Sequence, residues 1–168
     1  HSFPTRRSSD LDGCRSVGGI FLPRLLRLLG CEVIEVDCQP DGRFTRRPEP
    51  VASELGRLCE RVRGRKCAVG FAVDPDADRL SLVDEQGNAL GEEYTLALAV
   101  AHVTKRNGGG DVVVNLSTSM MVDTAAKANG GKVVRTPIGE ANVVDRILDE
   151  DVQIGGEGVA QAGHGVGL

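Results

Sequence analysis

Three aspartates at alternate positions, followed at once by an arginine, constrain this chain more than any other feature. The four residues are Asp74, Asp76, Asp78 and Arg79. They lie between two short apolar runs, 67–73 and 80–83, that are typical of strands. Carboxylates crowded in this way repel one another, so a folded chain keeps them together chiefly when a divalent cation compensates their charge. Such oxygen ligands suit Mg²⁺, and the stretch therefore predicts a strand-loop-strand unit around a Mg²⁺ site.

The arginine narrows the choice of ligand. A guanidinium group binds phosphate bidentately, so Arg79 beside a cation indicates a phosphoryl ligand. A calcium loop of the helix-loop-helix kind is excluded, because it requires glycine where Arg79 stands and helices on both sides. Two alternatives stay open. One is a solvated acidic turn, and the other is a haloacid-dehalogenase-type phosphatase, which also has Asp-x-Asp after a strand but a small hydroxyl or β-branched residue in place of Asp78.

Composition argues against nucleic-acid and membrane partners. The net charge of −4 gives no basic field for nucleic acid, and five aromatic residues with no Trp offer little surface for base stacking. No apolar run reaches the length of a membrane span, and no signal peptide is visible. The five cysteines form no CxxC pair, so we interpret them as reduced residues of a cytoplasmic protein.

The pattern of apolar runs, glycines and helical periodicity predicts an α/β fold made of two consecutive small domains with mixed, mainly parallel sheets. In the first domain, leucines at 22, 25, 26 and 29 mark a helix, 33–36 a strand and 51–62 a second helix. After the acidic loop, 92–107 reads as a third helix. The second domain then alternates strand and helix. Its predicted strands are 111–116, 132–136 and 152–154, with hydroxyls at 117–119 capping the helix that follows the first of them.

Four segments follow from this pattern. Residues 1–11 match nothing around them and resemble a translated sequencing adaptor, so we exclude them from the fold. Residues 12–107 form the first domain, and the three glycines at 108–110 mark the boundary. Residues 108–158 form a partial second domain. Residues 159–168 are a doubtful tail.

Three motifs in this order resemble the α-D-phosphohexomutases, the superfamily of phosphoglucomutase, phosphomannomutase and phosphoglucosamine mutase. They are the metal-loop sequence DPDADR at 74–79, RTPIGE at 135–140 and GGEG at 155–158. The first has Pro and Ala where the family more often has glycines, but it keeps all three carboxylates and the arginine. The resemblance extends from about residue 11 to residue 158 and implies the family's domains II and III.

The resemblance also implies an activity and a set of site residues. The expected reaction moves a phosphoryl group between O1 and O6 of a glucose, mannose or glucosamine phosphate, through a phosphoserine and a bisphosphorylated sugar. Mg²⁺ would be held by Asp74, Asp76 and Asp78, and Arg79 would contact the phosphate. The expected sugar site consists of Glu157, Gly158, Thr136, Gly139 and Glu140.

The chain also departs from the family pattern. The family's phosphoserine lies in a Ser-His-Asn-type loop of domain I, and no such loop occurs in these 168 residues. We expect the family's phosphate-clamping domain IV to lie outside these residues as well. We therefore expect a fragment that has no mutase activity alone and whose partners are domains I and IV of the parent enzyme. A non-catalytic α/β binding module is the remaining alternative.

Overall fold

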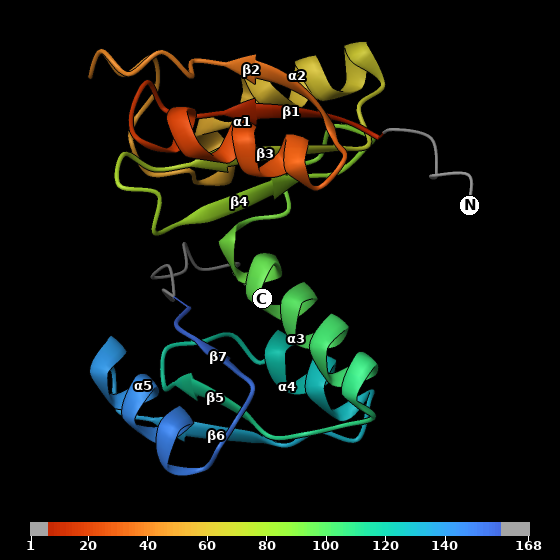
Figure 1. The fold of residues 1–168 in the computed structure, drawn as a ribbon, viewed down its shortest axis with the longest axis vertical. Coiled ribbons are helices and arrows are strands. Elements are labelled where there is room, and N and C mark those ends of the chain that lie inside the picture. The colour runs from red at the N-terminus through yellow and green to blue at the C-terminus, as the bar shows by residue number, and fades with distance from the viewer. Residues whose placement is uncertain (1–6, 159–168) are drawn as a thin grey trace, which may run out of the picture. The chain divides into compact units, whose positions relative to one another are not determined.

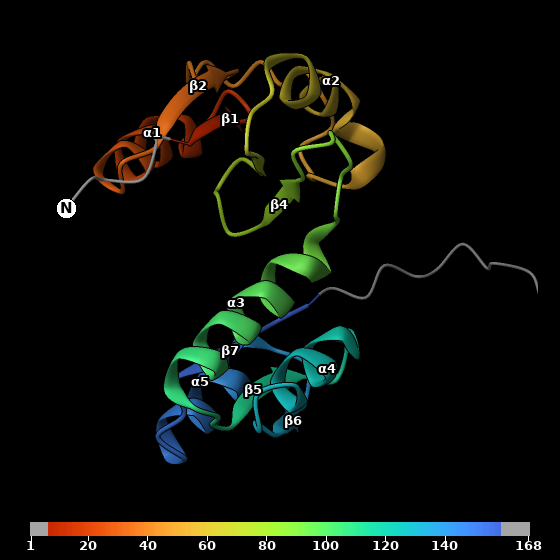
Figure 2. The same ribbon diagram turned by 90° about the vertical axis from the view of Figure 1, so that its right-hand side faces the viewer.

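The computed structural model describes residues 7–158, which form two compact units that meet in the chain between Glu92 and Glu93 (Figures 1 and 2). The boundary predicted at 108–110 is therefore too late by one helix. That helix, α3 (Glu92–Asn107), belongs to the second unit, because Ala97 and Val100 on its inner face pack in the core of that unit. The predictions for residues 1–6 and 159–168 fall outside the described residues.

The first unit is a four-stranded mixed sheet with the strand order β2-β1-β3-β4, in which only β4 runs antiparallel. Its elements are β1 (Ser8–Asp12), α1 (Gly18–Leu28), β2 (Glu32–Val36), the 3₁₀ helix η1 (Ala52–Glu54), α2 (Gly56–Arg65), β3 (Val69–Val73) and β4 (Leu80–Val83). Helices α1 and α2 cover opposite faces of the sheet (Figures 1 and 2). The mixed, mainly parallel α/β class predicted from the sequence is confirmed for this unit.

The exclusion of residues 1–11 was wrong for the last four of them. Residues 8–11 begin β1, which pairs with both β2 and β3 and is thus an inner strand of the sheet. Leu11 is fully buried there, and so is Asp10. The sequence concealed this strand because a charged residue in an inner strand breaks the apolar pattern by which buried strands are recognised.

Helix α1 packs differently from the expectation. Its leucines at helical spacing predicted an apolar face, yet Leu25 and Leu29 are 50% and 70% exposed. The buried residues of the helix include Gly19, whose backbone approaches the next loop so closely that an added Cβ would lie 2.4 Å from the Cys38 carbonyl oxygen. Helix α1 is therefore held in place by backbone contact, and most of its large side chains are exposed.

The second unit is a three-stranded parallel sheet with the order β6-β5-β7. After α3, its elements are β5 (Val112–Asn115), α4 (Met121–Lys127), β6 (Val133–Thr136), α5 (Glu140–Asp149) and β7 (Ile154–Gly156). Val112 and Val114 of the central strand pack against α3 and α4, while α5 covers the other face (Figure 2). Three consecutive valines in β5 are fully buried, as expected for a parallel strand covered on both sides.

Helix α3, the longest helix of the chain among residues 7–158, still lacks the combination of length and apolar content required to cross a bilayer, and the other described helices lack it as well.

The buried Asp10 leads to a prediction about stability. Its Oδ1 lies 3.5 Å from Nη2 of Arg61, while its Oδ2 and the Arg61 Nε have no hydrogen-bond partner among the described residues. Removing one member of a buried ion pair leaves the charge of the other without compensation, so Asp10→Val would leave the mostly buried Arg61 unpaired. We expect Asp10→Val to lower the free energy of unfolding by about 2 kcal/mol or more, measured by urea denaturation.

The exposed Asp111, just before β5, provides the matched control. Asp111→Val should leave the urea midpoint almost unchanged, because that side chain remains in water. A midpoint for Asp10→Val equal to or above that of the unmodified chain would contradict the prediction.

Candidate functional site

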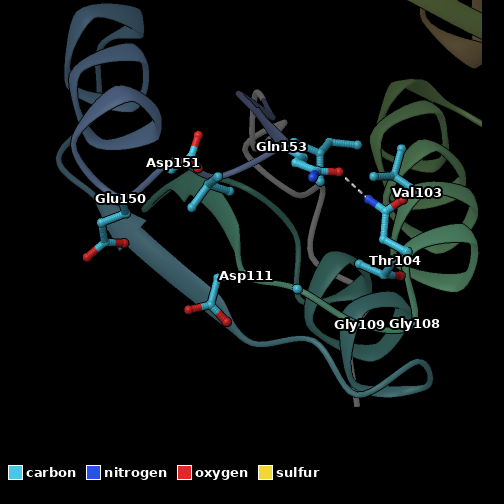
Figure 3. A pocket seen from close by; sticks show the side chains of 12 residues that line it. Val103, Thr104, Gly108, Gly109, Asp111, Glu150, Asp151 and Gln153 are labelled. Atoms are coloured by element: carbon cyan, nitrogen blue, oxygen red, sulfur yellow. Dashed lines mark hydrogen bonds between the residues drawn. The ribbon is translucent and has the colours of Figure 1, made fainter.

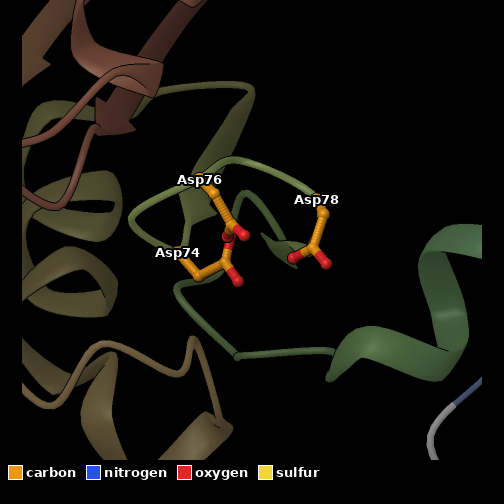
Figure 4. A group of neighbouring side chains, drawn as sticks. All are labelled: Asp74, Asp76 and Asp78. Atoms are coloured by element: carbon orange, nitrogen blue, oxygen red, sulfur yellow. The ribbon is translucent and has the colours of Figure 1, made fainter.

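The three aspartates of the acidic loop converge after β3, in the connection to β4 (Figure 4). Each offers a carboxylate oxygen, and these oxygens all lie within 4.8 Å of one another. Asp74 is buried at the end of the strand, whereas Asp76 and Asp78 are exposed. The structure therefore brings the predicted metal ligands together, with one oxygen source anchored in the protein and two facing solvent.

The loop is held in a strained conformation. Ala77 adopts a left-handed φ of +62°, a region that costs a residue with a Cβ about 1–2 kcal/mol. Its amide donates to the Asp74 carbonyl oxygen at 3.3 Å, which closes the turn. From outside the loop, the Ser16 hydroxyl donates to the Pro75 carbonyl oxygen at 2.6 Å. These contacts fix the backbone that carries the carboxylates.

Arg46 supports the same loop from beneath, and sequence reasoning missed it. Its guanidinium is almost fully buried; Nε donates to Asp12 Oδ2 at 2.9 Å, and Nη2 donates to the Val73 carbonyl oxygen at 2.6 Å. It therefore joins the ends of β1 and β3, at the residue that precedes Asp74. The only sequence signal was its place in an arginine-rich loop, which did not distinguish it from its neighbours.

Arg79, the predicted phosphate contact, lies beside the acidic cluster and is partly exposed. Its backbone amide donates to Asp74 Oδ1 at 3.3 Å, and its Nε lies 3.6 Å from Asp74 Oδ2 and 3.9 Å from Asp78 Oδ1. Its Nη1 contacts Glu49 Oε1 at 3.1 Å. A guanidinium has five N–H groups, so this arginine can hold its place against the carboxylates and still offer donors to an anion.

The electrostatics of Asp74 fit a bound cation. Burial, a hydrogen bond with Asp78 and the charges of Asp78 and Asp76 together raise the pKa of its carboxyl group to about 6, against the lowering effect of the Arg79 amide. A nearby positive charge would favour the ionised form of this carboxyl group and so offset the cost of its burial. Three carboxylates and no nitrogen or sulfur ligand form the oxygen set that Mg²⁺ prefers. The residues present therefore fit the group.

In the second unit, the structure brings two predicted sugar-site residues into contact. Glu157, which follows β7, is exposed, and its Oε1 accepts a hydrogen bond of 2.9 Å from the Gly139 amide. Gly139 has a φ of +125°, which favours glycine and lets its N–H face the carboxylate at the start of α5. Both residues lie at the carboxyl end of the parallel sheet, where ligand sites of open α/β sheets are found.

The hydroxyls at 117–119 serve the Glu157 loop more than they serve a helix. Ser119 Oγ does accept a hydrogen bond from the Met121 amide near the start of α4. The Thr118 hydroxyl, in contrast, accepts from the Gly158 amide at 2.9 Å, and the Ser117 hydroxyl lies 2.7 Å from the Gly158 carbonyl oxygen. Sequence reasoning assigned all three residues to the cap because their partner is some forty positions away.

The other two predicted sugar-site residues lie nearby but differ in character. Thr136 is buried at the end of β6, with its hydroxyl 3.1 Å from the Pro137 carbonyl oxygen, and it lines a hollow of about 420 Å³. Glu140 is the exposed first residue of α5. Thr136 is thus a buried part of the end of β6, whereas Glu140 presents an exposed carboxylate at the start of α5.

A larger hollow, of about 520 Å³, lies at the amino ends of strands β5 and β7 (Figure 3). Its lining includes Asp111, Glu150 and Asp151, which precede β5 and β7, and Asn107 donates a hydrogen bond to Gln153 across one side. None of the predicted site residues lines it. The hollow is therefore separate from the site at the carboxyl ends of the strands.

Comparison with known proteins identifies both units. Residues 10–87 match the family model "Phosphoglucomutase/phosphomannomutase, alpha/beta/alpha domain II", and residues 91–166 match domain III of the same family. The chain is 40% identical over 148 residues to a phosphoglucomutase/phosphomannomutase of Thermococcus kodakarensis, covering 88% of this chain and 32% of that protein. It is 39% identical over 158 residues to a probable phosphoglucosamine mutase of Methanopyrus kandleri, covering 89% of this chain and 35% of that protein.

Solved structures agree with the sequence comparison. A putative phosphomannomutase from Thermus thermophilus superposes with a TM-score of 0.79 at 25% identity, covering 90% of this chain and 36% of that one. The fold thus matches two consecutive domains of this family of phosphosugar mutases. The chain belongs to the phosphoglucomutase/phosphomannomutase family, whose domains II and III it carries, and it spans about a third of the length of the relatives it matches.

The raised pKa of Asp74 predicts a pH dependence of stability in the absence of divalent cations. Between the ordinary aspartate pKa of 3.8 and the folded value of about 6, the native state binds more protons than the unfolded state, so the contribution of Asp74 to stability decreases as the pH rises. Asp74→Asn removes this titration. From pH 5 to pH 7 in EDTA, we expect the variant to gain about 1 kcal/mol relative to the unmodified chain, measured by urea denaturation.

Asp111→Asn, at an exposed site, is the control and should follow the unmodified chain at each pH. Parallel stability curves for Asp74→Asn and the unmodified chain across this range would show that the Asp74 carboxyl titrates normally, contrary to the prediction.

Proposed function

We propose that these two domains form the metal side and the sugar side of a phosphohexomutase that interconverts hexose 1-phosphate and hexose 6-phosphate through a phosphoserine and a bisphosphorylated sugar. The observation that carries the proposal is the convergence of Asp74, Asp76 and Asp78 within 4.8 Å at the end of β3, with the first of them buried. These three residues would hold Mg²⁺. When bound, Mg²⁺ would neutralise charge on the transferring phosphoryl group.

The residues around the cluster are suited to positioning a phosphate. Arg79 is kept next to the cation site by Asp74 and Asp78, and it would direct its remaining N–H groups to the oxygens of the phosphoserine. Arg46 and Ser16 would keep the loop from moving when charge is redistributed during transfer. Fixed donors of this kind stabilise a transition state because they do not have to reorganise as the reaction proceeds.

Glu157 is proposed to accept hydrogen bonds from hydroxyl groups of the sugar. Its carboxylate is exposed, yet it is held by the Gly139 amide, so it can receive a ligand without first losing its orientation. Gly158 and Thr136 would maintain the shape of the sheet edge around it, and Glu140 would line the same site from the start of α5. The hexose is glucose, mannose or glucosamine phosphate, in keeping with the names of the relatives.

The nucleophile is proposed to come from outside these residues. Ser117, Thr118 and Ser119 are committed to hydrogen bonds with the Glu157 loop and with the start of α4, which leaves them unsuited to carry a phosphoryl group. Domains I and IV of the parent enzyme would supply the serine and the clamp for the second phosphate, in a cytoplasmic enzyme. Membership in the mutase family disfavours a haloacid-dehalogenase-type phosphatase.

The first test is whether the chain binds Mg²⁺. A ligand bound by the native state alone stabilises it by RT ln(1 + [L]/Kd), about 1.4 kcal/mol at ten times the Kd. We expect millimolar Mg²⁺ to raise the thermal midpoint by a few degrees, and Asp76→Asn to abolish most of this shift. Glu85→Gln, which removes one negative charge from the exposed neighbouring turn, should retain it. Equal shifts in both variants would indicate non-specific screening and would exclude the proposed site.

A second test concerns activity. In a coupled assay with Mg²⁺ and a trace of glucose 1,6-bisphosphate, we expect the 168-residue chain to convert no glucose 1-phosphate into glucose 6-phosphate, because the serine that exchanges the phosphoryl group is proposed to lie in another domain. Turnover that disappears in Asp74→Asn would contradict the assignment of the nucleophile to another domain. Release of inorganic phosphate from a generic phosphate ester would instead favour the phosphatase alternative.

A further inference from the structure

A chain of hydrogen bonds with a fixed direction connects Gly158 to Glu157 through the end of strand β5. It begins at the Gly158 amide, which can only donate and which donates to Thr118 Oγ1 at 2.9 Å. The single proton of that hydroxyl is thus free to point to Asn115 Oδ1, which lies 2.7 Å away. Asn115 Nδ2 then donates to Glu157 Oε1 at 3.0 Å. Each step follows from the preceding one, because a backbone N–H has no acceptor function.

The direction of this chain fixes the orientation of the Asn115 amide. An asparagine amide presents a nearly symmetric shape with a donor at one end and an acceptor at the other, so its orientation depends on its partners. Here Oδ1 receives the Thr118 hydroxyl, and the Ser117 hydroxyl lies 2.9 Å from the same atom. A reversed amide would place an NH₂ group against the Thr118 hydroxyl, whose proton has no other partner among these contacts. The NH₂ group is therefore directed at Glu157.

Asn115 and Gly139 act on the same carboxylate oxygen. Both donate to Glu157 Oε1, at 3.0 and 2.9 Å, and this leaves Oε2 to accept hydrogen bonds from a ligand. Asn115 is 2% exposed, whereas Glu157 is exposed, so the asparagine touches the carboxylate from the protein side only. A second carboxylate, Glu93, accepts from the Ser119 amide, and its oxygens lie 2.9 Å from the position that a Cβ on Gly158 would take, which also restricts the loop.

We propose that Asn115 is a positioning residue for Glu157, and that Thr118 fixes the amide orientation on which this role depends. The inference rests on the proposed function in one respect, namely that the Glu157 carboxylate binds a hydroxyl-bearing sugar phosphate. Asn115 contributes no group to the ligand itself. It holds one oxygen of Glu157 by a donated hydrogen bond, so that the other oxygen faces the site.

The test uses ¹⁵N NMR of the full 168-residue chain, with glucose 1-phosphate and Mg²⁺ as the probe and inorganic phosphate as the probe without hydroxyl groups of a sugar. Asn115→Asp keeps the size of the side chain but cannot donate to Glu157. We expect the Gly139 amide proton to change its shift as its acceptor moves, and the Kd for glucose 1-phosphate to increase about tenfold, while binding of inorganic phosphate is unchanged. Asn129→Asp, at a half-buried asparagine that donates only to backbone carbonyls of α3 and α4, is the matched control.

A second variant keeps the proposal testable if a new carboxylate beside Glu157 prevents folding. Thr118→Val does not touch Glu157, yet it removes the hydroxyl that orients Asn115. We expect it to shift the Gly139 amide in the same direction by a smaller amount, and to add little to the effect of Asn115→Asp when the two are combined. An unchanged Gly139 amide in folded Asn115→Asp or in Thr118→Val overturns the proposal.

The proposed role of Glu157 in sugar binding can be tested separately from the positioning role of Asn115. If Glu157→Gln leaves the Kd for glucose 1-phosphate unchanged while Asn115→Asp still shifts the Gly139 amide, the positioning of Glu157 by Asn115 is supported and the proposed role of Glu157 in sugar binding is overturned.

Discussion

The removal of one carboxylate from water is the constraint on which the first unit depends. Asp74 ends an inner strand and is buried, while two further carboxylates lie within a few ångströms of it. Arg79 compensates part of this charge from the side, and Arg46 and Ser16 hold the backbone in place. The remaining imbalance is expressed in the raised pKa of Asp74. The first unit thus keeps a local electrostatic cost that a cation of the right size would offset.

The two units apply the same architectural solution to different chemistry. In each, a covered sheet with parallel strands fixes the strand ends, and the side chains proposed to bind ligands stand on the connections that leave those ends. The first unit presents an oxygen cluster. The second presents Glu157, which is oriented by a buried amide and two hydroxyls rather than by charge. A cation site tolerates like charges, whereas a site for sugar hydroxyls requires an acceptor with a defined direction.

Much of this could be predicted from the sequence, because local signals were strong. The helix at 92–107, the strand at 80–83 and the α/β alternation were recognised from periodicity and glycines, and the spacing of the three aspartates indicated their convergence. What failed depended on distant partners. Asp10 concealed an inner strand, the packing of α1 was determined by backbone contact at Gly19, and α3 was assigned to the wrong unit.

The supporting residues of the sites were missed for the same reason. Asn115 is a single polar residue after three valines, and nothing in its neighbourhood shows that Glu157, forty-two positions later, lies beside it. Arg46 was one of several arginines in a loop. Residues that bind a ligand in a known motif are visible in sequence, while the residues that orient them are found only when the chain has folded.

Ala77 shows what the acidic loop requires of the polypeptide. A side chain at a left-handed φ makes the turn less favourable than it would be with glycine, yet it also narrows the set of shapes that the free chain can explore. The loop is thus slightly strained, and it has few alternative backbone conformations. A cation that arrives finds its oxygens already assembled, and less of its binding energy is spent on arranging them.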